Sequence, residues 1–179
     1  MTKTRALRKS DLKGRIRDIP DFPKEGIIFK DITTLLKDAE AFKKSVNLLA
    51  NKFKKERIDY VVGVEARGFI FGAALAYKLG AGFVPVRKKG KLPAKTKSIT
   101  YELEYGKDVL EIHEDALEPS TRVLIVDDLL ATGGTIKAVS ELVKSQKATI
   151  AGVAFLVELQ FLRGKEKLKD LPVYSVIKY

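Results

Sequence analysis

The sequence predicts an α/β fold in which helices flank a central, mostly parallel, twisted sheet. Short apolar runs with strand character alternate along the chain with segments whose apolar residues recur at helical spacing. Strands separated by helices need crossover connections, which place the strands parallel in one sheet. The 179 residues suffice for one domain with a real core, and no repeat or linker divides them. We therefore expect a single domain over residues 1–179.

The amino-terminal third is expected to be helical at both ends and extended between them. Residues 4–17 indicate a basic helix, and the two prolines that follow force an extended or turning path. Residues 27–29 then indicate a short strand or a buried loop. Asp38 is typical of an N-cap, and we expect its helix to run to about Arg57. The apolar face of that helix follows steps of four, three and four, at Phe42, Val46, Leu49 and Phe53.

The rest of the chain alternates between apolar runs and helical segments. Helices are expected at residues 68–79 and from the glycine-containing turn after residue 126 to about residue 147. Apolar and polar residues alternate on either side of Tyr105-Gly106-Lys107, which predicts a β-hairpin. Because parallel sheets bind ligands at the carboxyl ends of their strands, the loops after these strands are the candidate binding segments. The strands of the sheet are expected at residues 60–64, 82–86, 122–126, 148–157 and 173–177.

Composition excludes several kinds of site. The chain has no cysteine, which excludes disulfides and thiolate metal sites. His113 is the single histidine, so a His-cluster zinc site is excluded too, and we expect it at the surface or at a strand end. The net charge of +11 favours anionic partners. Residues 66–101 hold eight basic residues and no acidic one, whereas residues 102–128 hold nine acidic residues. This indicates either two solvated faces, or one segment that holds a polyanion and another that handles hydroxyls, protons or cations.

Nothing in the sequence predicts a membrane protein. The longest apolar stretch, residues 148–157, is about half of a membrane span. The first seventeen residues lack the apolar core of a signal peptide. They are basic, which favours a surface helix and leaves a transit-like arm as the alternative. We expect a cytoplasmic location.

The strongest signal is the segment VLIVDDLLATGGT at residues 123–135. An apolar strand leads into two acids, a small loop with two glycines, and a helix whose amino terminus favours an anion. No lysine follows the glycines, so this is not a Walker A loop, and the spacing does not match GxGxxG. The pattern predicts a cradle for a monophosphate with carboxylates beside it. The residues concerned are Ala131, Thr132, Gly133, Gly134 and Thr135, with Asp127 and Asp128 preceding them.

This strand–acid–acid–loop element resembles the signature of the type I phosphoribosyltransferases, which bind phosphoribosyl pyrophosphate (PRPP). Lys30 stands where arginine is more usual in that family, and the resemblance extends from Leu7 to Tyr179. It implies the type I phosphoribosyltransferase fold, with a flexible hairpin lid at about residues 97–113. It also implies a small base-binding hood with an N-terminal arm at about residues 1–34. Four further segments are similar to its adenine-specific members: residues 22–32, 65–69, 87–93 and 101–112.

The resemblance implies that the chain joins N9 of adenine to C1′ of PRPP and releases AMP and pyrophosphate, as in purine salvage. Asp127 and Asp128 can then accept hydrogen bonds from the ribose hydroxyls and stabilise an oxocarbenium-like sugar. Mg²⁺ is the expected cofactor, held mainly by PRPP oxygens and not directly by protein side chains. The cations expected to bind pyrophosphate are Arg67, Arg87, Lys88 and Lys91.

The base and the proton transfer are assigned by the same resemblance. Glu104 and Tyr105, at the tip of the hairpin, are the expected catalytic residues, and a carboxylate there can accept or relay an adenine proton. In the family, part of the basic loop reaches across a dimer interface, which implies a homodimer. The expected adenine-binding residues are Ile28, Phe29, Lys30 and Leu159.

Two alternatives stay open. One is a sibling enzyme that acts on another base, against which the segments 26–32 and 102–107 argue. The other is a PRPP-sensing regulator or a nucleic-acid-binding protein on the same fold, favoured by the positive charge. Residues 1–21 are too short for a helix-turn-helix unit, and aromatic residues do not interleave with the basic runs. We therefore expect no specific nucleic-acid partner.

Overall fold

The computed structural model describes residues 7–102 and 106–179. The chain divides into two compact units, Met1–Leu48 and Leu49–Tyr179, and each is described by itself. Among the described residues, no helix combines the length and the apolar character that crossing a membrane requires.

The amino-terminal unit begins with a short helix and a two-stranded antiparallel sheet. The helix η1 (Lys9–Arg15) is a 3-10 helix, so the longer basic helix expected over residues 4–17 is wrong in type and extent among the described residues. The Asp11 carboxylate accepts the Arg8 backbone N–H at 2.9 Å and closes the first turn tightly. The strands β1 (Arg17–Pro20) and β2 (Ile28–Asp31) follow and pair with each other. Of the residues 27–29 expected in a short strand or a buried loop, Ile28 and Phe29 lie in the strand β2, and Ile27 precedes it. Ile28 is exposed.

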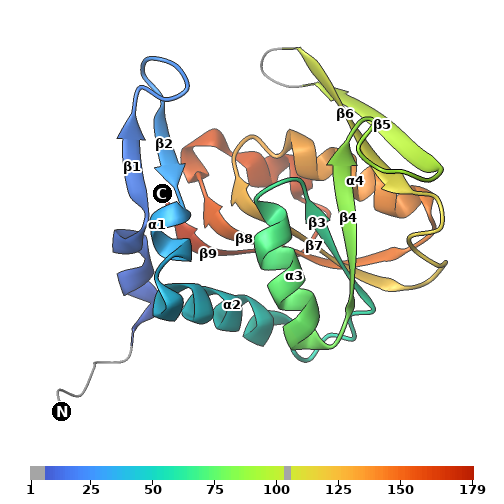
Figure 1. Cartoon of the computed structure of the whole chain (residues 1–179), viewed down its shortest axis with the longest axis horizontal. Helices are drawn as coiled ribbons and strands as arrows, with labels where there is room; N and C mark the ends of the chain where they lie inside the picture. Colours follow the sequence, from blue (N-terminus) through green and yellow to red (C-terminus); the bar gives the residue numbers. More distant parts are fainter. Residues whose placement is uncertain (1–6, 103–105) are drawn as a thin grey trace. The chain divides into compact units, whose positions relative to one another are not determined.

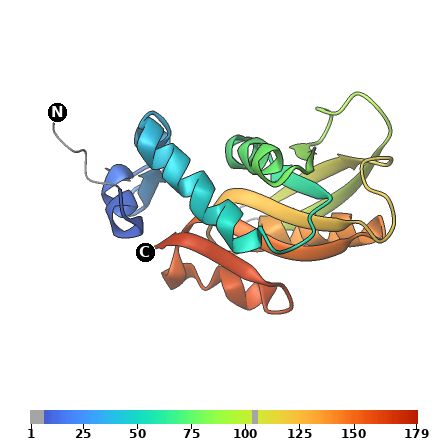
Figure 2. The same cartoon turned by 90° about the horizontal axis from the view of Figure 1, so that it is seen from below.

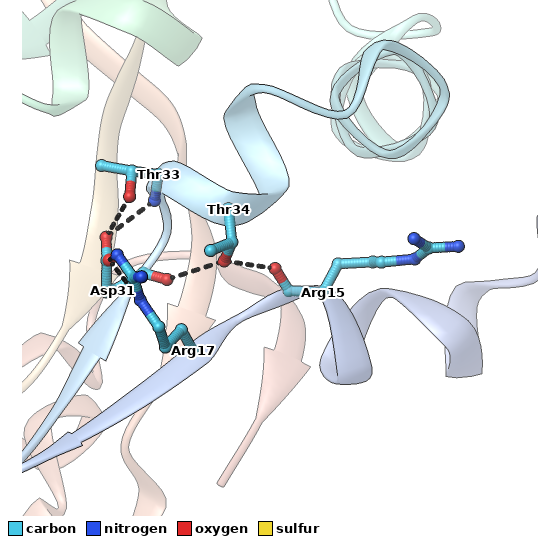
Figure 3. Close-up of polar contacts among 5 residues, drawn as sticks. All are labelled: Arg15, Arg17, Asp31, Thr33 and Thr34. Carbon is cyan, nitrogen blue, oxygen red and sulfur yellow. Dashed lines mark hydrogen bonds and ion pairs between the residues drawn. The ribbon is translucent and has the colours of Figure 1, made fainter.

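A carboxylate at the end of β2 organises the next turn, α1 (Thr33–Leu36), as Figure 3 shows. Asp31 Oδ1 accepts the Thr33 hydroxyl at 2.7 Å and the Thr33 N–H at 2.9 Å. Arg17 Nε donates to Asp31 Oδ2 at 3.1 Å. The Thr33 hydroxyl and the Arg17 guanidinium lower the pKa of Asp31 to about 2. In the same turn, the Thr34 hydroxyl donates to the Arg15 carbonyl at 2.7 Å.

The N-cap predicted for the next helix, α2 (Ala39–Phe53), is confirmed. Asp38 Oδ1 accepts the backbone N–H groups of Glu40 and Ala41, each at 3.1 Å. The helix ends at Phe53 and not near Arg57, because the chain turns there to enter the next strand.

The second unit holds a seven-stranded sheet in the order β5-β6-β4-β3-β7-β8-β9. Five neighbouring strands are parallel to one another, namely β4, β3, β7, β8 and β9. The strands β5 and β6 form an antiparallel hairpin, and β6 pairs with β4. The mostly parallel sheet and the hairpin are therefore confirmed. The strands are β3 (Tyr60–Val64), β4 (Gly82–Lys88), β5 (Thr96–Glu102), β6 (Lys107–His113), β7 (Arg122–Leu130), β8 (Thr149–Glu158) and β9 (Val173–Lys178).

Two helices cover opposite faces of this sheet, as Figures 1 and 2 show. The helix α3 (Gly68–Leu79) links β3 to β4, and α4 (Gly134–Ser145) links β7 to β8. From β3 the chain moves to one side of the sheet, whereas from β7 it moves to the other. Right-handed crossovers in opposite directions place their helices on opposite faces. The strand order therefore reverses between β3 and β7, which is where such sheets bind ligands.

Strand β7 differs from its prediction in a way that affects the site. It was expected to end at Val126, before the two acids, but it continues through Leu130. Pairing with β8 continues at Asp127 with Phe155 and at Leu130 with Glu158. The sheet thus holds the backbone of both acids. Two short 3-10 helices follow β8, η2 (Gln160–Leu162) and η3 (Gly164–Leu168), and they were not predicted.

Candidate active site

Two adjoining hollows lie at the carboxyl ends of β3 and β7. The smaller one has a volume of about 70 Å³ and is lined by residues between Asp127 and Ile136. Liquid water occupies about 30 Å³ per molecule, so this hollow suits one small anion. The larger one has a volume of about 340 Å³. Its wall includes Glu65, Arg67, Lys88, Tyr101, Asp108, Asp127, Asp128, Ala131 and Thr135.

A wider hollow of about 630 Å³ lies at the opposite ends of the strands and holds none of the predicted site residues. Its two arginines are engaged with acids of the same rim. Arg57 pairs with Asp59 at 3.4 Å, and Arg122 pairs with Glu56 at 2.8 Å. We assign no chemistry to it.

The small hollow is formed by a cradle of backbone, residues 131–135, at the start of α4. Gly133 precedes the helix with φ +80, a conformation that favours glycine. The first N–H groups of a helix have no acceptor inside it, and the helix dipole favours an anion there. Thr132 and Thr135 add hydroxyl donors, and both line the same hollow. All five predicted cradle residues are thus brought together.

A residue that the sequence analysis missed supports the cradle from behind. Gly164, the first residue of η3, is buried against the Ala131 carbonyl. A Cβ built on Gly164 would overlap that oxygen, and a Cβ built on Gly133 would lie 2.5 Å from the Gly164 carbonyl. Because neither residue has a side chain, the backbone at Gly164 can pack directly against the backbone of the cradle. No periodicity or motif marks Gly164, because the contact joins segments about thirty residues apart.

The two predicted acids lie side by side at the junction of the hollows. Asp127 Oδ1 accepts the Asp128 backbone N–H at 2.8 Å, and Arg67 Nε lies 3.0 Å from Asp128 Oδ2. Burial and the neighbouring Asp128 carboxylate raise the pKa of Asp127. Burial also raises the pKa of Asp128, but Arg67 opposes that rise. Gly68 makes room for this pair, because a Cβ there would lie 2.8 Å from Asp127 Oδ1.

The four predicted cations, here called the cation rim (Arg67, Arg87, Lys88 and Lys91), are all ion-paired. Arg87 Nε lies 3.3 Å from Glu65 Oε2, and Lys91 Nζ pairs with the other oxygen of Glu65. The Lys88 backbone N–H donates to Glu65 Oε2 at 3.0 Å. Burial alone would raise the pKa of Glu65, but these hydrogen bonds lower it to about 2. Arg67 and Lys88 line the larger hollow, whereas Arg87 and Lys91 line neither hollow.

The hairpin contributes two further residues that the sequence analysis did not assign. Asp108 Oδ2 lies 2.9 Å from Lys88 Nζ, and this pairing raises the pKa of Lys88 and lowers that of Asp108. Tyr101, opposite Asp108 in the β5–β6 pairing, lines the larger hollow and is half-buried. Alternation in the hairpin indicated which residues share a face, but not that this face reaches the site. His113, the last residue of β6, lies at a strand end as expected.

The predicted base-binding residues fall in different units. Ile28, Phe29 and Lys30 belong to the amino-terminal unit, where the Phe29 ring meets Phe22 edge-on at 5.1 Å and Lys30 Nζ lies 2.7 Å from Asp18. Leu159, in the second unit, follows β8, and its N–H donates to the Leu130 carbonyl. It lines neither hollow. The predicted catalytic residues Glu104 and Tyr105 lie outside the described residues.

Within residues 7–102 and 106–179, no group of three or more His, Asp or Glu side chains is placed to hold a metal ion. Carboxylate oxygens are nevertheless present where a ligand would enter, at Asp127 and Asp128. Their negative charge suits a nearby hard divalent cation whose oxygen ligands come from a bound substrate.

Comparison with known proteins identifies the family. Residues 32–178 match the phosphoribosyl transferase domain. The chain is 57% identical over 179 residues to the adenine phosphoribosyltransferase of Acidobacterium capsulatum, which covers 100% of this chain and 99% of that protein. It is 61% identical over 169 residues to that of Syntrophotalea carbinolica, covering 94% of this chain and 99% of that one. The chain belongs to the adenine phosphoribosyltransferase family.

Solved structures of adenine phosphoribosyltransferases agree with this membership. That from Thermoanaerobacter pseudethanolicus has a TM-score of 0.93 and 56% identity, covering 96% of this chain and all of that one. That from Saccharomyces cerevisiae, complexed with adenine and an imino-altritol bisphosphate, has a TM-score of 0.88 and 43% identity, covering 94% of this chain and 97% of that one. The α/β fold of the type I phosphoribosyltransferases, predicted from the sequence, is confirmed.

Proposed function

We propose that this chain transfers the phosphoribosyl group of PRPP to N9 of adenine, giving AMP and pyrophosphate in purine salvage. The observation that carries the proposal is the anion cradle beside Asp127 and Asp128, at the point where the strand order reverses. Membership of the adenine phosphoribosyltransferase family supports adenine as the base.

The cradle holds the 5′-phosphate, and the two acids hold the ribose. Backbone N–H groups of residues 131–135 donate to the phosphate, with the hydroxyls of Thr132 and Thr135. Asp127 and Asp128 accept hydrogen bonds from the ribose hydroxyls, because these donors reduce the electrostatic repulsion between two adjacent carboxylates. Their negative charge stabilises C1′ as the bond to pyrophosphate lengthens and its electron pair leaves with that group.

Pyrophosphate is bound by the cation rim. Arg67 and Lys88 already line the larger hollow, and Arg87 and Lys91 complete the set from its margin. Magnesium, the expected cofactor, neutralises phosphate charge when it is bound. We propose that PRPP oxygens supply most of its ligands, with Asp127 and Asp128 nearby, and that no protein side chain ligates it directly.

Adenine is bound by the base-binding residues that the resemblance implies. The Phe29 ring offers a stacking face, and backbone groups of Ile28 and Lys30 read the edge of the base. Leu159 is the fourth of these residues and contributes an apolar side chain. Glu104 takes the N9 proton as N9 attacks C1′, with Tyr105 beside it in the hairpin lid, residues 97–113. Residues 1–34 form the arm and hood of a single domain.

The exposed face of α3 supports a homodimer. A helix that is apolar all round is usually buried. The sheet side of α3 buries Phe71 and Leu75, yet Tyr77 is 92% exposed and Ile70 is 41% exposed on the outer side. We propose that a second copy covers this face, as the resemblance implies. Ile70→Glu is expected to raise the dimer dissociation constant, and light scattering across a dilution series will report it.

We place the reaction in the cytoplasm, with no membrane or specific nucleic-acid partner. The absence of cysteine from the chain means that no disulfide ties its folding to an oxidising compartment. Fractionation of cells that express the tagged chain tests the location. Retention on immobilised DNA that persists in high salt would contradict the last point.

A coupled assay of AMP formation tests the function. The chain is incubated with PRPP, Mg²⁺ and each purine base in turn, and with orotate. We expect product with adenine only, and loss of product when EDTA removes the metal. Turnover of another base in preference to adenine would contradict the specificity, and no turnover of any base would contradict the reaction.

A separate experiment tests the catalytic assignment. Glu104→Gln keeps the shape of the side chain and removes its basicity, so the single-turnover rate with saturating PRPP is expected to fall. Positioned proton transfer contributes about 10²- to 10⁴-fold, and this loss should lie near the lower end. A wild-type rate in that assay would reject Glu104 as the base.

A further inference from the structure

One residue that lines the larger hollow was given no role by the motif or by the resemblance. That residue is Tyr101, in the hairpin strand β5. Tyr101 shares the hollow with Thr135 of the cradle and with Asp127. Its ring is half-buried, although it lies on a strand whose neighbours Thr100 and Glu102 are exposed.

The register of the hairpin explains why this side chain faces the site. Tyr101 pairs with Asp108 and Ile99 pairs with Leu110, so all four side chains lie on one face of the hairpin. Leu110 is buried in the core of this unit, and Ile99 packs against that core. The same face must therefore point inward at Tyr101, and the Lys88–Asp108 ion pair lines the same hollow.

The hairpin also lies directly over the start of α4. A Cβ built on Gly134 would lie 3.5 Å from the Glu102 carbonyl, one residue beyond Tyr101. Thr135 of the cradle lines both hollows, and Tyr101 lines the larger one with it. A ligand held by the cradle therefore lies beside the hollow that contains the phenol.

The chemistry of the phenol suits a phosphate ester better than a base or a cation. Burial raises the pKa of Tyr101 above its ordinary value of 10, although Thr135 opposes the rise. The hydroxyl is thus a neutral donor at physiological pH. Asp127 and Asp108 face it with negative charge, and Lys88 faces it with positive charge. A neutral donor can reach a phosphate oxygen without adding charge to this crowded set, and its ring displaces water.

We infer that Tyr101 is a further substrate-binding residue, whose hydroxyl donates a hydrogen bond to the 5′-phosphate held in the cradle. The inference rests on the proposed function, since it takes the phosphoribosyl group as the ligand. It also gives the hairpin a direct contact with substrate through residues that the structure describes.

Calorimetric titration of Tyr101→Phe tests the inference, because phenylalanine keeps the ring and removes only the donor. We expect the dissociation constants of ribose 5-phosphate and AMP to rise about tenfold, the value of one hydrogen bond to a charged group. The affinities for pyrophosphate and adenine should stay within twofold. Tyr60→Phe is the matched control, because it removes a tyrosine hydroxyl that donates to Glu118 at 2.7 Å, away from the cradle. It should leave all four affinities unchanged.

The outcomes separate the inference from the proposed function. Wild-type affinity of Tyr101→Phe for ribose 5-phosphate would overturn the inference while AMP synthesis by the wild-type chain stands. A loss confined to pyrophosphate would place Tyr101 in the other subsite and would overturn it too. Failure of the wild-type chain to make AMP would overturn the proposed function itself. A melting temperature of the variant close to that of the wild type excludes a merely structural effect.

Discussion

The anion cradle and the cation rim are both proposed to bind phosphate groups, yet they are built in opposite ways. The cradle has no cationic side chain, and its donors are backbone and hydroxyl groups fixed between Gly133 and Gly164. The rim consists of charges, and each of its four cations already has a carboxylate partner. The cradle can therefore bind an anion as it stands, whereas the cations of the rim meet pyrophosphate while they are held in place by internal carboxylates.

The largest expected effect tests the fixed geometry of the cradle. Gly133→Val places a branched side chain at φ +80 and against the Gly164 carbonyl. Displacing a binding group by about 1 Å can cost about 10²-fold, so we expect kcat/KM for PRPP to fall by at least that factor. Gly80→Val is the control, because Gly80 has φ +68 but no atom within 4 Å of its Cβ. It should lower stability and keep activity. Near-normal AMP formation by Gly133→Val would reject the cradle.

A second prediction concerns a cation of the rim that already lines the hollow. Lys88→Ala should raise KM for PRPP about tenfold to a hundredfold, since a charge-assisted hydrogen bond contributes about 1.5–3 kcal/mol. KM for adenine should change little. The exposed neighbour Lys89 provides the control variant, Lys89→Ala. A rise in KM for adenine alone would place Lys88 at the adenine subsite and would contradict its role in pyrophosphate binding. Arg87→Ala and Lys91→Ala should follow the same pattern with smaller changes.

A third prediction asks whether the cradle needs its support. Gly164→Ala forces the Ala131 carbonyl to move, and overpacking of this kind costs about 1–3 kcal/mol. We expect the dissociation constant of AMP to rise about tenfold, measured by calorimetry, while pyrophosphate affinity is kept. Gly14→Ala, where no atom lies within 4 Å of the new Cβ, should change neither. Equal loss of both ligands would show that the substitution acts on the whole fold.

A fourth prediction tests the role of Glu65, the carboxylate that pairs with Arg87 and Lys91. Glu65→Gln removes the charge that stations Arg87 and Lys91, and KM for PRPP should rise about twofold to fivefold, as for ion pairs worth up to about 1 kcal/mol. Because the pKa of Glu65 in the folded chain, about 2, lies below its ordinary 4.5, its charge stabilises the fold above pH 4.5. This contribution is lost as the pH falls from 4.5 toward 2. Denaturant melts should therefore show a stability difference between the two chains at pH 7 that shrinks below pH 4.5. A constant difference would contradict the ion pairs.

The smallest effect is a difference in salt dependence. Added salt screens charge pairs more than it screens short hydrogen bonds to a buried anion. Between 50 and 500 mM KCl, pyrophosphate affinity should fall by a larger factor than ribose 5-phosphate affinity. Equal slopes in the two titrations would remove the distinction between cradle and rim.

Most of the fold followed from local pattern, and the misses share one physical reason. The strand at residues 60–64 and the helix at residues 68–79 were predicted correctly, because each buries a continuous apolar face. Strand β7 was predicted too short because two acids, Asp127 and Asp128, follow its apolar run, and local propensity disfavours acids in strands. Pairing with β8 overrides that propensity, and no local signal reports a neighbouring strand.

The site divides in the same way. The cradle residues are contiguous in sequence, so one motif revealed all five of them. Gly164, Tyr101 and Asp108 reach the site only through tertiary packing. Nothing near Gly164 in the sequence indicates its contact, and the resemblance placed the hairpin at the site without assigning Tyr101 or Asp108. The pairing of the cation rim with carboxylates was equally invisible, since the runs of positive and negative charge suggested separate roles.

The extension of β7 through Leu130 also determines how slowly the backbone amides in this part of the molecule exchange with solvent. Amides that pair with β8 between Asp127 and Leu130 can exchange with solvent only when the two central strands separate. Their hydrogen exchange should therefore be as slow as that of the apolar centre of the sheet, with or without ligand. The carboxylates proposed to hold the ribose are thus carried by backbone that keeps its place from one turnover to the next.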